Sequence, residues 1–153
     1  LGDEVSSSVK SRLLGEWAEN DPIAAAEWLN SQEVDERTMG RASSAIIREW
    51  TRYDMTASAE WLNSQPSTPA LDRAVMSYTY QAAQEDPASA MTWAESIDND
   101  WMRSRMMQHV AGNWKNDDPE AFQSYIDNSK LSDKQKKSLE EAQAQHGGSR
   151  WWR

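Results

Sequence analysis

Cysteine is absent from the chain, and positively charged residues are scarce. Without cysteine there can be no disulfide framework and no thiolate metal site, and redox chemistry gives no information about the compartment. The chain has 16 Lys and Arg residues but 25 Asp and Glu residues, which gives a net charge of −9. This sign argues against nucleic acid and anionic membrane surfaces as main partners, because both are bound by clustered cations.

Long apolar runs are also missing. None approaches the ~20 residues that span a bilayer, so we expect no integral membrane segment. No signal peptide is visible, but the chain starts at Leu1 rather than Met, and we interpret it as a processed or excised piece of a longer protein. Its 153 residues suffice for one domain with a substantial core. We expect that domain at 1–146 and a flexible tail at 147–153.

Histidine is limited to His109 and His146, and neither has a second histidine at helical spacing, so a two-histidine zinc motif is absent. We expect His109 to have an ordinary surface or groove role. The glycines form no phosphate-cradling loop, and no serine stands in a nucleophile-elbow pattern. The sequence therefore predicts no catalytic residue, no cofactor and no metal site, and a protein that is not an enzyme.

Phenylalanine occurs once but tryptophan nine times, and most of the tryptophans recur in phase. The repeat aligns on four aspartates spaced by 33, 32 and 32 residues, which are Asp21, Asp54, Asp86 and Asp118. Four residues before them stand Trp17, Trp50, Ala82 and Trp114. Seven residues after them stand Trp28, Trp61, Trp93 and Tyr125. Aromatic residues in register at two positions over four copies indicate an internal repeat.

Proline follows three of the four aspartates, at positions 22, 87 and 119. Asp before Pro favours a helix start, because the carboxylate accepts from free first-turn amides and proline has no amide to satisfy. Calcium binding is the alternative interpretation of these turns, but capping explains one Asp per unit, and the twelve-residue calcium-loop pattern is missing. Long helices are expected at 6–19, 36–52, 69–84 and 101–116. Short helices are expected at 22–31, 55–64, 87–97 and 119–128.

These helix pairs predict an all-α fold, a right-handed α-α superhelix or solenoid of about four helix–turn–helix units. The units are expected at about 6–35, 36–68, 69–100 and 101–132, followed by a charged capping helix at 133–145. One hairpin cannot bury both of its faces alone, so consecutive units should stack. We expect the recurring aromatic rings to lie in the core between consecutive hairpins, and Trp61→Ala to cost about 3–5 kcal/mol of stability.

The chain resembles a class of bacterial tandem helical repeats in which Trp precedes Asp-Pro, and Ala and a second Trp follow. The resemblance covers roughly residues 6–129. It is carried by Trp17/Asp21/Pro22/Ala24/Trp28, Trp50/Asp54/Ala57/Trp61, Asp86/Pro87/Trp93 and Trp114/Asp118/Pro119/Ala121/Tyr125. Met55, Ala82, Ser89 and Tyr125 depart from the pattern. The period is close to that of tetratricopeptide repeats, whose signature is missing. The resemblance implies the fold, favours a periplasmic or cell-envelope location over a cytoplasmic one, and implies no activity.

Arginine recurs thirteen residues before three of the four aspartates, at Arg41, Arg73 and Arg105. A cation in the first turn of a helix opposes the helix dipole, so a compensating contact is expected. We favour ion pairs between units, with Glu27 and Glu60 as partners. The alternative is a cationic stripe that grips an acidic peptide or a carboxylate.

Aromatic residues outside the repeat pattern are the better binding candidates. Tyr80 and Trp101 are not needed for packing, and amphipathic rings of this kind are typical interface anchors. Tyr78 occupies a core position. The segment Arg150-Trp151-Trp152-Arg153 is expected either to be disordered or to dock on the groove, a partner or a lipid interface.

The sequence favours a non-catalytic scaffold that binds a protein or a peptide, with Arg41, Arg73, Arg105, Tyr80 and Trp101 as candidate partner-binding residues. The alternative is a structural spacer or self-associating module of a larger bacterial envelope protein, and a homo-oligomer is possible under either interpretation. An open groove lined by the candidate residues would favour the scaffold.

Overall fold

The computed structural model describes the backbone of residues 2–143 and the side chains of residues 8–143. Within this part the chain is all helical and has no strand, which confirms the all-α class. The long helices are α1 (Gly2–Ala18), α3 (Glu36–Trp50), α5 (Asp72–Glu85) and α7 (Asp100–Asp117). The short helices are α2 (Pro22–Asn30), α4 (Met55–Ser64), α6 (Pro87–Glu95), α8 (Pro119–Asn128) and α9 (Asp133–Glu140). A single 3₁₀ turn, η1 (Pro69–Leu71), precedes α5.

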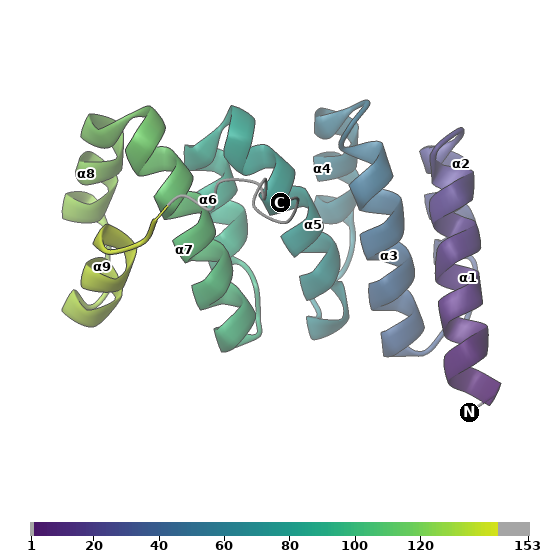
Figure 1. Cartoon of the computed structure of the whole chain (residues 1–153). Coiled ribbons are helices and arrows are strands. Elements are labelled where there is room, and N and C mark those ends of the chain that lie inside the picture. The colour runs from purple at the N-terminus through teal and green to yellow at the C-terminus, as the bar shows by residue number, and fades with distance from the viewer. Residues whose placement is uncertain (1, 144–153) are drawn as a thin grey trace, which may run out of the picture.

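The helices form two layers (Figure 1). The long helices α1, α3, α5 and α7 stand side by side in one layer, and each packs against the next. The helices α2, α4, α6 and α8 form the second layer, and α9 packs against α7. No helix in the described part of the chain is both long and apolar enough to cross a membrane. The expected tail at 147–153 lies outside the described residues.

The four repeat aspartates are N-caps, as the sequence predicts. Their carboxylates accept from the backbone amides of Ala24, Ala57, Ser89 and Ala121 at 2.9–3.1 Å. Each aspartate has nearly the same backbone conformation, with φ between −141° and −147° and ψ between 80° and 89°. Because a cap of this kind depends on neighbouring residues only, it forms identically in every copy.

Capping also sets the start of the last helix, α9, which is shorter than expected. Ser132 and Gln135 form a capping box at the start of α9. The helix ends at Glu140 rather than 145. Lys115 of α7 donates to the carbonyl oxygens of Glu140 and Ala142 at 2.7 and 2.6 Å. These carbonyls therefore have a cationic partner where the helix stops.

The repeating aromatic rings pair across the two helices of each hairpin, and those of Trp50 and Trp114 are also buried in the core that the hairpins share. Trp17 lies 6.4 Å from Trp28, and Trp50 lies 6.4 Å from Trp61, measured between ring centroids. In both cases the two rings come from the long and the short helix of one hairpin. The core between hairpins also contains smaller residues such as Ala42, which is fully buried.

Tyr78 supplies the ring that the third hairpin lacks. Alanine stands at position 82, where the other hairpins have tryptophan. Tyr78 is one turn earlier on α5, is 5% exposed, and lies 4.9 Å from Trp93. The expected core position of Tyr78 is therefore confirmed, and each hairpin has at least one aromatic pair across its two helices.

Candidate binding face

Arg41, Arg73 and Arg105 lie in the first half of α3, α5 and α7, three helices that stand side by side. Arg73 and Arg105 are exposed, and Arg41 is half-buried. The favoured ion pairs with Glu27 and Glu60 are wrong. Among the side chains of residues 8–143, no ion pair involves any of these three arginines. The glutamates lie on α2 and α4, in the second layer.

Arg105 has an aromatic partner instead of an acidic one. Its guanidinium carbon lies 5.4 Å from the ring centroid of Trp101, which is within the range of a cation–π contact. The Trp101 side chain is 64% exposed. The structure therefore brings together two of the candidate binding residues, one turn apart on α7, and leaves both accessible to solvent.

A groove of about 380 Å³ lies between α3, α5 and α7 and is mostly apolar. Its lining comprises Ser44, Arg48, Arg73, Met76, Ser77, Tyr80, Gln81 and Met106. Among these residues there is no carboxylate. Arg73 and Tyr80 are thus candidate residues that share one hollow, whereas Arg41, Trp101 and Arg105 do not line it.

Polar contacts connect the two helices α3 and α5 at the groove. The hydroxyl oxygens of Ser44 and Ser77 lie 2.8 Å apart. The side-chain amide of Gln81 donates to the carbonyl oxygen of Arg48 at 2.9 Å and to Thr51 Oγ1 at 3.2 Å. These contacts join α3 and the residue that follows it to α5 along the groove.

Of the surface or groove role expected for His109, the structure supports the second, because the residue is buried beneath Tyr80, which lines the groove. The imidazole and phenol rings are stacked, with centroids 4.3 Å apart and planes 7° apart. His109 is buried, its Nδ1 has no hydrogen-bond partner, and its Nε2 lies 3.5 Å from Asn113 Nδ2. Burial lowers the pKa of His109 below its ordinary value, so the ring is neutral at pH 7. The neutral ring supports the exposed Tyr80 from below.

We expect the free energy of unfolding to fall as the pH is lowered through His109's titration. The pKa of His109 is lower in the folded chain than in the unfolded chain, so the unfolded chain takes up the proton first. Its contribution is complete above pH about 6.5 and is lost progressively below it. Urea unfolding measured at several pH values should show this slope, and His109→Gln should reduce it below pH about 6.5. An identical slope in the variant would contradict the assignment.

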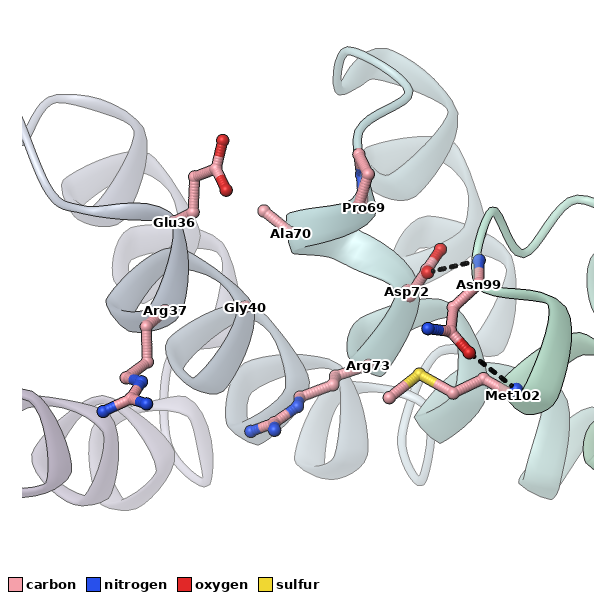
Figure 2. Close-up of a pocket in the computed structure, with 9 residues that line it drawn as sticks. All are labelled: Glu36, Arg37, Gly40, Pro69, Ala70, Asp72, Arg73, Asn99 and Met102. Atoms are coloured by element: carbon pink, nitrogen blue, oxygen red, sulfur yellow. Dashed lines mark hydrogen bonds between the residues drawn. The ribbon is translucent and has the colours of Figure 1, made fainter.

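A second hollow, of about 320 Å³, lies at the N-terminal ends of the same three helices (Figure 2). Asp72, which is buried, accepts from the backbone amides of Asp98 and Asn99, both at 2.9 Å. Asn99 in turn caps α7 by accepting from Met102 N at 3.0 Å (Figure 2). Asp72 is not among the residues that the sequence pattern singles out. It has no counterpart at the same offset in the other units, so the repeat gives no signal for it.

Asp72→Ala is expected to lower the free energy of unfolding by about 2 kcal/mol, because two part-buried backbone amides lose a charged acceptor. Asp133→Ala is the matched control, since Asp133 is also the first residue of its helix but is exposed. The control should cost only a few tenths of a kcal/mol, from the helix dipole alone. Chemical denaturation of both variants measures the difference, and equal losses would show that Asp72 does not hold the loop before α7.

No protein-family model, curated protein or solved structure matches this chain. Among the described residues, no three His, Cys, Asp or Glu side chains are grouped so that they could hold a metal ion. The groove, the three arginines and Trp101 together form the candidate binding face of the molecule.

Proposed function

We propose that the protein is a non-catalytic scaffold that binds an extended, acidic protein segment on the face formed by α3, α5 and α7. In this proposal the chain is a short right-handed solenoid of four helix–turn–helix units closed by α9. The identical Asp caps at intervals of 32 and 33 residues support four equivalent units. Solenoids of this kind present extended surfaces to peptides and protein segments.

The observation that carries the proposal is the set of arginines without ion pairs beside an apolar groove. Arg41, Arg73 and Arg105 come from neighbouring helices, and no carboxylate pairs with them in the described part of the chain. A guanidinium group that is not neutralised internally can form a bidentate contact with a partner's carboxylate. The groove beside Arg73 offers Met76, Tyr80 and Met106 to an apolar side chain of the same partner.

Charge segregation between the two layers supports an acidic partner on this face. The helices α2, α4, α6 and α8 contain no Lys or Arg. Their charged residues are Glu27, Glu60, Glu95, Glu120 and Asp127. An acidic segment is repelled by this second layer and attracted to the arginines of the first, so charge alone selects the face.

The surroundings of His109 support a non-catalytic role. A general base must reach the proton that it removes and is usually oriented by a third group. His109 lies under Tyr80, and its Nδ1 has no partner. Its pKa is lowered by burial alone, so the imidazole acts as packing beneath the groove.

Selection from a library of random displayed peptides tests this proposal. We expect enrichment of peptides that carry several Asp or Glu residues around one large apolar residue. The enriched peptide, labelled with fluorescein, should bind about tenfold more weakly to Arg73→Glu, a loss of roughly 1.4 kcal/mol. Raising the salt concentration should weaken binding further.

Arg52→Glu is the matched control, because Arg52 follows α3, lies away from the groove and pairs with Glu49. Its affinity for the enriched peptide should equal that of the unmodified protein. Enrichment of basic peptides, or equal losses in Arg73→Glu and Arg52→Glu, would refute an acidic partner on this face.

A further inference from the structure

Large apolar side chains are exposed together on the outer face of the first hairpin. Val9, Leu13 and Trp17 follow one another at every fourth residue of α1, and they are 42%, 53% and 40% exposed. Residues at this spacing lie along one side of a helix. Trp28 of α2 packs against Trp17 and is also exposed, so the stripe continues onto the second layer.

The same positions are buried in every later hairpin. Val9, Leu13 and Trp17 stand twelve, eight and four residues before their repeat aspartate. The nine residues at these offsets in the other hairpins are at most 7% exposed. They are Ala42, Ile46, Trp50, Ala74, Tyr78, Ala82, Met106, Val110 and Trp114. Those hairpins each have a preceding hairpin packed against them, whereas in the described part of the chain nothing covers α1 on this side.

The opposite end of the molecule is built differently. Leu139 of α9 is buried in the common core, while the outer positions of α9 are polar and exposed. These outer residues are Asp133, Lys134, Gln135, Lys137 and Glu140. A polar outer face closes a helical stack, and an apolar one leaves it open to association. Only the α1 end therefore has the surface of an internal unit.

We propose that the outer face of α1 and α2 is a self-association surface, on which two copies of this chain pack end to end about a two-fold axis. The charges on this surface are self-complementary. Arg12 and Glu16, which border the stripe, form an exposed ion pair at 3.7 Å. Lys10 lies beyond Arg12, and Glu19 lies beyond Glu16. When two α1 helices cross antiparallel near Leu13, Lys10 and Arg12 of each copy approach Glu16 and Glu19 of the other.

A two-fold arrangement also sets the size of the assembly. Such an interface uses the same patch on both copies and closes on itself. In the described part of the chain, the polar face of α9 then lies at both outer ends of the dimer. The net charge of −9 on each copy opposes association at low salt, but it is screened beyond about 8 Å at physiological ionic strength.

Sedimentation velocity over a wide range of concentration tests the proposal. The unmodified chain should show a reversible monomer–dimer equilibrium. Leu13→Glu should raise the dimer Kd by about a hundredfold, because each dimer places two carboxylates in the apolar contact. Tyr53→Glu is the matched control, since Tyr53 is exposed and lies on the turn after α3. It should dimerise like the unmodified chain.

A charge exchange tests the antiparallel geometry independently of folding. Arg12→Glu should weaken the dimer about tenfold, and the double variant Arg12→Glu/Glu16→Arg should restore it to within about threefold. Leu13 and Arg12 are already exposed in one copy, so circular dichroism of the variants should match that of the unmodified chain. A chain that stays monomeric at all concentrations, a dimer that survives Leu13→Glu, or a double variant without rescue would overturn the proposal. Peptide binding on the α3, α5 and α7 face is unaffected by any of these outcomes.

Discussion

Replacing Trp50 by alanine is expected to lower the free energy of unfolding by about 3–5 kcal/mol. Trp50 is 5% exposed and lies at the end of α3, where its ring meets that of Trp61 at 6.4 Å. Ile46 and Ile47, one turn earlier, are fully buried in the same cluster. Truncation leaves a cavity that these branched side chains cannot fill without leaving their preferred rotamers.

Trp61→Ala provides the comparison, and its expected loss falls to about 2 kcal/mol. The sequence predicts about 3–5 kcal/mol for this position, because the repeat gives both tryptophans the same importance. In the structure, Trp61 is only half-buried, and its indole N–H is buried without a hydrogen-bond partner. Removing that unpaired donor offsets part of the lost apolar burial. Urea denaturation of the two variants should rank Trp50 above Trp61, and the reverse order would show that the wrong ring has been assigned to the core.

Gly40→Ala is expected to destabilise the fold by about 3 kcal/mol, although alanine normally favours a helix. A Cβ atom added at Gly40 would lie under 3.0 Å from the backbone carbonyl oxygen of Ala70. Backbone cannot move aside as a flexible side chain can, so α3 and η1 would have to separate. Their separation would disturb the adjoining hollow that contains Asp72 and Arg73.

Gly15→Ala is the matched control for this substitution. Gly15 is also a buried glycine in a long helix, but its added Cβ would meet Ala45 Cβ at 3.4 Å, which is an ordinary contact. The control should gain up to about 1 kcal/mol from helix propensity. Thermal unfolding of the two variants gives opposite shifts if the close approach at Gly40 is real. A stabilising Gly40→Ala would contradict it.

Features that depend on neighbouring residues could be predicted from the sequence, and the helix starts show why. Asp followed by Pro fixes a helix N-terminus through one carboxylate and one fixed backbone angle, both within four residues. The starts of α2, α4, α6 and α8 therefore agree with prediction. The substitute ring of Tyr78 was placed in the core for the same reason, since its helical offset matches that of Ile46 and Val110.

Features that depend on which helices meet could not be predicted in this way. The arginine ladder was visible in the sequence, but the expected glutamate partners lie in the other layer, and the contact of Arg105 is with Trp101. The sequence left both a surface and a groove role open for His109, because one imidazole gives no indication that a tyrosine from another helix stacks over it. The sequence pattern does not indicate Asp72, because its role as a hydrogen-bond acceptor depends on a loop 26 residues later in the chain.

The sequence by itself determined the all-α class, the capped helix starts and the recurring aromatic positions, because each of these depends on short-range geometry that every copy repeats. Only the tertiary structure decided which copies of a repeated position are buried. Leu13 and Ile46 occupy the same offset, yet one is 53% exposed and the other fully buried. Burial depends on whether another hairpin lies alongside, and a repeated local pattern carries no information about its neighbours in space.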